Sequence, residues 1–240
     1  MTGLVLRDLS GMAEFLEAEA LQRAVWGEGD APDPADLMMV IQHEGGLCAG
    51  AFQGDLLLGY IFAFPTRDPA IQHSHRLAVL PEARGFRLGV RLKWYQRDWC
   101  LARGIDLVRW TFDPLRLPNA RLNIGSLGAT AHVYYPDYYG DMAGINAGAP
   151  SDRLLADWHL LAPAVAARAL GKATAPEDGR IVGRIAIPAD FAGLLSAAPE
   201  RALDERLRQR AALTEAFARH EEIAGFDREA RAYLLARRPA

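Results

Sequence analysis

Cysteine, excess positive charge and long apolar runs are all scarce in this chain of 240 residues, and each scarcity excludes a class of protein. The two cysteines, Cys48 and Cys100, match no metal-binding spacing, so we expect both to be buried small apolar residues. A formal net charge of -3 leaves no basic excess for a general nucleic-acid binder. No stretch approaches the ~20 apolar residues of a membrane span, and the N-terminus lacks the basic-then-apolar order of a signal peptide. We therefore expect a cytoplasmic protein that binds neither nucleic acid nor membrane.

The chain instead alternates strand and helix signals over most of its length. Its apolar fraction of 50% and charged fraction of 24% are typical of globular proteins. Apolar and alternating runs predict strands at 3–6, 46–53, 56–64, 72–80, 105–112, 129–135, 180–187, 221–226 and 230–236. Helical spacing predicts helices at 11–26, 84–103, 118–127, part of 151–170, and 199–219 with a stripe through Leu203, Leu207, Leu213 and Phe217. This order predicts an α/β (α+β) fold with a central mixed, mostly antiparallel sheet flanked by helices.

The segment from His73 to Gly89 is the most informative part of the chain. It reads as a strand, a tight turn with arginine and glycine, and the start of a helix. The turn leaves backbone N–H groups free at a helix N-terminus, which suits a bound diphosphate. His73 and His75 are two residues apart, so both side chains leave the strand on one face. Imidazole has the pKa that suits a base at neutral pH, although either histidine could equally be a satisfied polar core residue.

The strand and turn carry a resemblance to a known family. Leu77-Ala78-Val79, the following Pro81, and Arg84-Gly85-x-x-x-Gly89 resemble the GNAT superfamily of acyl-coenzyme A N-acyltransferases. The resemblance implies that the coenzyme contacts Leu77, Ala78, Val79, Arg84, Gly85, Phe86, Arg87, Leu88, Gly89 and Val90. Arg87 stands where that family usually has a glycine. If residue 87 already belongs to the helix, no positive φ is required of it, and its charge could assist the diphosphate.

Two finer resemblances concern the remaining chemistry. His73-x-His75-x-Leu77-Ala78-Val79 is similar to the strand of arylalkylamine-type N-acetyltransferases, which implies His73 and His75 as the catalytic residues that take the amine proton. The tyrosine that usually acts as the acid in this superfamily is replaced by Ile124. Later stretches resemble a bacterial GNAT group with an extended C-terminal region, some of whose members are associated with N-succinylation of amino acids. They make Asn119, Asn123, Tyr138 and Arg153 the candidate acceptor-binding residues.

Arg153 has two interpretations that the sequence leaves open. Its guanidinium could pair bidentately with a substrate carboxylate. Alternatively, Ser151 and Asp152 begin a helix, and Arg153 is only a solvated residue of its first turn.

The resemblance also implies an activity and a division of the chain. We expect residues 1–150 to form a GNAT catalytic core and residues 151–240 a C-terminal α/β extension. The core would move an acetyl or succinyl group from a coenzyme A thioester to a small amine or amino acid. The co-substrate is acetyl-CoA or another short acyl-CoA, and no metal is expected. The alternatives are a protein or peptide N-acetyltransferase and a non-catalytic acyl-CoA-binding regulator. A homodimer is a reasonable expectation because the charged C-terminal helix and extra strands offer a pairing surface.

Overall fold

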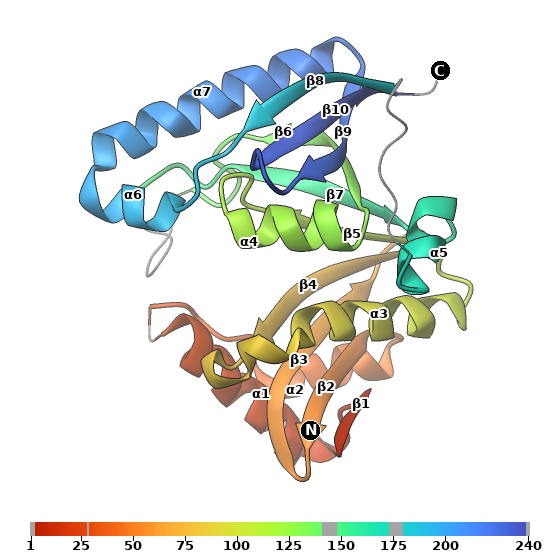
Figure 1. Ribbon diagram of the computed structural model, residues 1–240. Coiled ribbons are helices and arrows are strands. Elements are labelled where there is room, and N and C mark those ends of the chain that lie inside the picture. The colour runs from red at the N-terminus through yellow and green to blue at the C-terminus, as the bar shows by residue number, and fades with distance from the viewer. Residues whose placement is uncertain (1–2, 28, 141–147, 173–179, 239–240) are drawn as a thin grey trace. The chain divides into compact units, whose positions relative to one another are not determined.

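A computed structural model describes residues 3–27, 29–140, 148–172 and 180–238 (Figure 1). The chain forms two compact units, Met1–Arg109 and Trp110–Ala240, which divide within strand β5 (Leu107–Phe112). The loop expected after Tyr135 and the linker expected after Lys172 extend into residues 141–147 and 173–179, outside the described residues. The functional division at residue 150 stays a prediction.

The first unit is built on a sheet whose strands follow the chain. Its order is β1-β2-β3-β4-β5, with β1 (Leu4–Asp8), β2 (Leu47–Gln53), β3 (Leu56–Pro65) and β4 (Ile71–Val79). Neighbouring strands are antiparallel except the last pair, in which Ile71–His73 run parallel to Leu107–Arg109. The predicted parallel pair is confirmed.

Helices cover both faces of this sheet. On one face, α1 (Gly11–Trp26) and α2 (Ala35–His43) pack against a cluster centred on Tyr60 and Phe62. On the other face, α3 (Leu88–Leu101) packs through Leu88 and Leu92 (Figure 1). The sequence did not predict α2, because its short apolar pattern follows directly on a loop rich in proline and aspartate. Cys48 and Cys100 are both buried and unbridged, as expected.

The second unit holds an antiparallel sheet in the order β7-β6-β9-β10-β8. Its strands are β6 (Thr130–Tyr135), β7 (Arg153–His159), β8 (Ile181–Ala186), β9 (Glu221–Asp227) and β10 (Ala232–Arg237). The prediction of a helix beginning at Ser151 was wrong. Leu154, Ala156 and Trp158 are fully buried at every second position, which is the period of a strand.

The helices of the second unit depart further from expectation. The predicted segment at 118–127 is a short α4 (Leu117–Asn119) that continues as a π-helix (Ala120–Ser126). α5 (Pro163–Ala169) and α7 (Pro199–Ala218) follow, with an unpredicted α6 (Phe191–Ala197) between them. None of the helices in the described ranges is long and apolar enough to span a bilayer.

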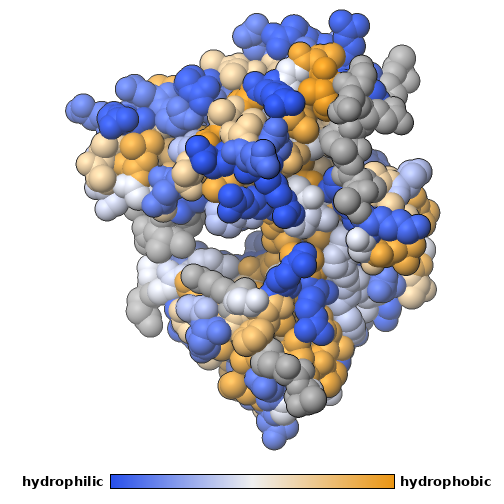
Figure 2. All heavy atoms as spheres, viewed as in Figure 1, coloured by the Kyte–Doolittle hydropathy of each residue, from blue (hydrophilic) through white to orange (hydrophobic). Residues whose placement is uncertain are grey.

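The buried face of α7 differs from the predicted stripe. Leu203 and Leu207 are 40% and 45% exposed, whereas Leu213 is buried. Arg206 and Gln209 instead occupy buried positions of this helix. Hydrophilic residues with apolar ones between them cover the visible face of α7 (Figure 2). The helix therefore turns a partly polar side toward its own unit.

Candidate functional site

The histidine strand β4 contains one residue more than the part of β3 that it faces. Phe62 pairs with Arg76, whereas the next residue, Ala63, pairs with Ser74. His75 therefore has no partner of its own across this ladder, which is the arrangement of a β-bulge. A bulge re-aims the side chains on either side of it, and bulges are frequent near active sites.

The bulge decides which side chains of β4 face α3. Before it, Ser74 accepts a hydrogen bond of 2.8 Å from the Lys93 ammonium on α3. After it, Leu77 and Val79 pack into the apolar cluster under α3. The polar part of the strand face toward α3 therefore ends at Ser74, its apolar part begins at Leu77, and His75 lies between them.

The two histidine rings lie together on the face of the sheet opposite α3. The His73 ring stacks on Phe64 with 4.9 Å between centroids, and the His75 ring lies 5.5 Å from the same phenylalanine. The two imidazoles are 6.4 Å apart. Burial, together with the nearby His75 and Lys93, lowers the pKa of His73 to about 4. His73 is therefore neutral at pH 7 and only weakly basic.

A carboxylate orients the other histidine. His75 Nε2 lies 3.3 Å from Asp33 Oδ1, and Arg76 Nε lies 3.1 Å from Asp33 Oδ2. Arg76 also pairs with Asp30 and stacks over Trp26 at 4.8 Å. A carboxylate on one ring nitrogen fixes the tautomer, leaving the other nitrogen to accept a proton. Sequence reasoning missed Asp33 because it lies 42 residues from His75, in a segment that reads only as a loop.

A buried polar network lies on the α3 side of β4. Lys93, only 2% exposed, donates to Gln96 Oε1 at 3.1 Å as well as to Ser74. Gln96 Nε2 in turn donates to Gln72 Oε1 at 2.7 Å. Burial lowers the pKa of Lys93 to about 7. The sequence placed Lys93 on a helix but carried no signal that this lysine is buried.

The turn after β4 differs from the sequence interpretation. A 3-10 helix spans Pro81–Phe86, and α3 begins only at Leu88 rather than near residue 84. Arg87 between them has φ 55° and ψ 30°, in the left-handed region. The expectation that residue 87 is already helical was therefore wrong. An arginine thus occupies a conformation that normally favours glycine, at the single residue that joins the 3-10 helix to α3.

Packing within the residues that the structure describes requires neither glycine of the turn. Gly85 and Gly89 are not among the glycines with positive φ. A Cβ added at Gly85 would meet nothing within 4 Å, and one at Gly89 only Leu77 Cδ2 at 3.7 Å. The first α3 amide to bond in this turn is that of Arg91, to the carbonyl of Arg87 at 3.1 Å. Helix geometry gives the three N–H groups before it no partner, so this end of α3 can accept an anion.

One edge of β4 has no paired strand after His73 in the part of the chain that the structure describes. Within the described residues, β5 pairs with β4 only along Ile71–His73. The backbone from Ser74 to Val79 therefore offers N–H and C=O groups on that side to an extended ligand. The predicted coenzyme-contacting residues Leu77, Ala78 and Val79 belong to this open stretch, and the turn follows it directly.

The predicted acceptor residues all belong to the second unit. Tyr138 is 49% exposed, and its ring lies 4.8 Å from that of Tyr139. The Arg153 guanidinium is 5.0 Å from the Tyr139 ring, so these residues form one cluster. Asn119 ends α4, and Asn123 is buried in the π-helix. Ile124, at the position of the usual tyrosine acid, is fully buried and serves packing.

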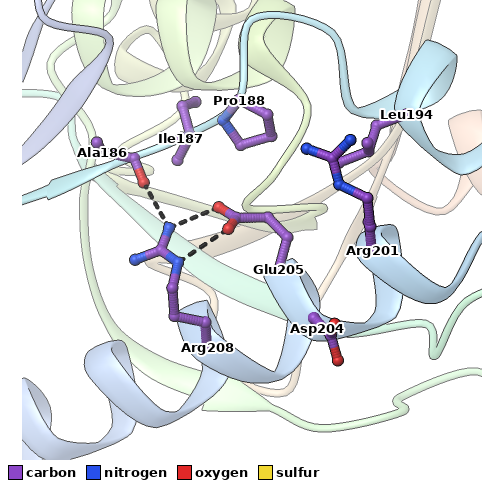
Figure 3. Close-up of a pocket in the computed structure, with 8 residues that line it drawn as sticks. All are labelled: Ala186, Ile187, Pro188, Leu194, Arg201, Asp204, Glu205 and Arg208. Atoms are coloured by element: carbon purple, nitrogen blue, oxygen red, sulfur yellow. Dashed lines mark hydrogen bonds and ion pairs between the residues drawn. The ribbon is translucent and has the colours of Figure 1, made fainter. Parts of the chain in front are cut away.

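A groove in the second unit contains none of the predicted site residues. It has a volume of about 580 Å³ and lies between the end of β8 and helices α6 and α7. Arg208 crosses its wall and bonds both Glu205 and the carbonyl of Ala186 (Figure 3). Two arginines and two carboxylates line the groove, so its formal charges balance, and Arg208 pairs with Glu205.

Known proteins resemble this chain at the level of family and fold. The Acetyltransferase (GNAT) family model matches residues 12–122. An aminoglycoside 6'-acetyltransferase type Ii superposes with a TM-score of 0.54 at 19% identity, covering 65% of this chain and 97% of that one. The ribosomal-protein-S18-alanine N-acetyltransferase of Escherichia coli gives 0.53 at 15% identity, covering 73% and 97%. YncA of Salmonella typhimurium, solved with its cofactor acetyl-CoA, gives 0.53 at 16% identity, covering 74% and 99%.

A sequence comparison with curated proteins finds no match. The structural likeness establishes the GNAT fold, so the predicted fold class is confirmed, and the family-model match over residues 12–122 supports the predicted superfamily.

Proposed function

Since residues 12–122 belong to the acetyltransferase (GNAT) family, we propose that the chain is an acyl-CoA-dependent N-acyltransferase acting on a small amine or amino acid. The observation that carries this proposal is the open edge of β4 that leads into the turn before α3. An extended thioester arm can pair with such an edge while its diphosphate meets the free amides of the helix. Gly85 and Gly89, which packing does not require, give the ligand close access to that backbone.

The transfer needs a neutral amine and a polarised thioester carbonyl. The amine nitrogen attacks the carbonyl carbon, the tetrahedral intermediate expels the coenzyme A thiolate, and the thiolate takes up a proton. His75, oriented by Asp33, is suited to receive the proton that the amine loses, directly or through water. His73 stays neutral beside it, and backbone N–H groups from Leu77 to Val79 are the candidate donors to the developing oxyanion.

The fold by itself does not determine which acceptor the protein uses. Proteins that share it are named for acceptors as different as aminoglycosides and a ribosomal protein. The acetyl or succinyl donor and the acceptor roles of Asn119, Asn123, Tyr138 and Arg153 stay predictions.

Coenzyme A release tests the proposal directly. The purified full chain is incubated with acetyl-CoA or succinyl-CoA and with a panel of amines, amino acids and peptides, and the free thiol is measured. We expect release that depends on a small acceptor, and at least a hundredfold loss in His75→Ala on the general scale of base catalysis, about 10²-fold or more. His43→Ala, an exposed histidine at the end of α2, is the matched control and should keep full activity.

Binding of coenzyme A separates the remaining outcomes. Gly89→Glu should abolish binding, whereas Gly89→Ala should fold and bind, because its Cβ makes only an ordinary contact. Release that is indifferent to His73→Ala and His75→Ala would refute the catalytic assignment. Binding without release on every acceptor would support the regulator instead, and release on peptides alone would support a peptide acetyltransferase.

A further inference from the structure

The bulge in β4 turns two consecutive side chains to the same face of the sheet. Neighbouring residues of a regular strand point to opposite faces. His75 and Arg76 nevertheless both reach the carboxylate of Asp33, at 3.3 and 3.1 Å. The bulge allows this, because His75 is the extra residue that has no partner on β3. The contact of His75 with its carboxylate therefore depends on where the bulge lies along β4.

A bulge one residue earlier would separate His75 from Asp33. His75 would then pair with Ala63, which now pairs with Ser74 and belongs to the apolar cluster under α3. Residues that pair across a ladder share a face, and a shift of one residue turns a side chain to the other face. The His75 ring would point toward α3, on the side of the sheet opposite to Asp33.

A buried polar network holds the residue that directly precedes the bulge. The Lys93 ammonium on α3 donates to the Ser74 hydroxyl at 2.8 Å, and to Gln96 Oε1 at 3.1 Å. Gln96 donates in turn to Gln72 Oε1 at 2.7 Å. Two alternate residues of β4, one on each side of His73, are thus bonded to α3. These bonds favour the register in which Ser74, and not His75, faces the helix.

An apolar side chain would fill the position of Lys93 at lower cost. Taking an ammonium group out of water is unfavourable even where hydrogen bonds compensate for part of the loss. The same helix buries Leu88 and Leu92 without such a cost. A buried residue that breaks the usual packing rule is expected chiefly where it serves a functional site. Lys93 breaks that rule next to the histidine strand.

We propose that Lys93 is a positioning residue: by holding Ser74 toward α3, it keeps the bulge at His75 and the imidazole on Asp33. Lys93 lies on the α3 side of the sheet and the histidine rings lie on the other, so it acts through Ser74 rather than by touching the reacting groups. The expected effect on turnover rests on the proposed function, whereas the placement of the ring does not.

NMR spectra of the full chain test the placement of the ring without any substrate. The His75 ring lies 5.8 Å from the Phe62 ring and 5.5 Å from the Phe64 ring, so the chemical shifts of its protons depend on its position. We expect Lys93→Met and Ser74→Ala both to move the His75 ring-proton shifts at a fixed pH. Leu92→Met changes a neighbouring buried position of α3 and is the matched control, which should leave these shifts unchanged.

Coenzyme A release then distinguishes positioning from general damage to the structure. Lys93→Met and Ser74→Ala should each lower kcat about tenfold with little change in the KM for acyl-CoA, the scale of one hydrogen bond. Both act through the contact of His75 with Asp33, so combining either with Asp33→Asn should cost little more than the larger single change. Independent effects would multiply instead. Ser74→Thr keeps the hydroxyl group and should keep most of the activity.

The outcomes separate this inference from the proposed function. If Lys93→Met fails to fold, Ser74→Ala tests the same hydrogen bond from its other end. His75 shifts that stay unchanged in Ser74→Ala, or losses of kcat that multiply with Asp33→Asn, would overturn the positioning role. Shifts that move as expected in a chain that releases no coenzyme A with any acceptor would support the placement by Lys93 and count against the proposed transfer.

Discussion

Replacement of Arg87 by glycine should stabilise the first unit. Arg87 adopts φ 55° and ψ 30°, where an L-residue with a Cβ is less stable by about 1–2 kcal/mol. Glycine removes this strain but gives the unfolded chain more freedom, which costs about 0.5–1 kcal/mol. The net gain in the free energy of unfolding is therefore about 0.5–1 kcal/mol.

Arg91→Gly is the matched control for this prediction. Arg91 is an exposed residue inside α3, four positions later, where glycine should destabilise the helix by about 1 kcal/mol. The same chemical substitution should thus have opposite signs at two neighbouring positions. Arg87→Ala keeps the left-handed strain while removing the charge, so its free energy of unfolding should stay close to that of the original chain.

Urea unfolding followed by circular dichroism measures these differences, and hydrogen exchange of α3 amides assigns them to the first unit. Destabilisation by Arg87→Gly as large as that by Arg91→Gly would refute the left-handed assignment. A gain in Arg87→Ala equal to that in Arg87→Gly would attribute the effect to charge rather than to backbone strain. Coenzyme A affinity measured on the same variants reports separately whether the Arg87 charge assists the diphosphate.

Three further perturbations test other parts of the structure. Asp33→Asn should lower kcat on the order of tenfold with little change in the KM for acyl-CoA, since it weakens the orientation of the catalytic base, while the exposed control Asp36→Asn leaves kcat unchanged. Because the pKa of buried Lys93 is about 7 when folded and about 10.4 when unfolded, the unfolded chain binds more protons between these values, and stability rises with pH across that window. Urea titrations at several pH values should therefore show that any stability advantage of Lys93→Met shrinks as pH rises, and an advantage independent of pH would contradict the burial of a charge. Gly128→Ala should cost about 1–2 kcal/mol for its positive φ. Its Cβ would also lie 2.9 Å from a guanidinium nitrogen of Arg168, which bonds the carbonyls of Ile124 and Gly125 and would have to move away from them. Thermal unfolding should therefore show a larger loss than Gly171→Ala, where φ is similar but the space is open.

Local sequence patterns predicted much of the fold. Apolar periodicity and turn residues, which act over a few neighbouring positions, predicted the strands at 46–53, 56–64 and 72–80 and the helix that follows them. The parallel pair of β4 and β5 followed from the helix between them, because a parallel connection needs such a crossover. Patterns of this kind fail where a short segment suits two structures, as at 153–159, which reads as helix and forms β7.

The site was only partly predictable for a different reason. His73 and His75 share a face because of spacing along one strand, and the sequence contains that spacing. The carboxylate that orients His75 comes from 42 residues away, and the pair of Arg206 with Asp113 joins residues 93 positions apart. Such pairings depend on which segments the tertiary structure brings together, and no local pattern reports them.

By itself, then, the sequence determined most of the strands, several of the helices, the turn that resembles the family, and the histidines beside it. The tertiary structure alone decided that Arg87 adopts a left-handed conformation, that Lys93 is buried, and that Arg206 is buried in a pair with Asp113. The reason is physical: periodicity and turn chemistry act between neighbours along the chain. Strain, burial and charge balance instead depend on contacts that exist only once distant segments have packed together.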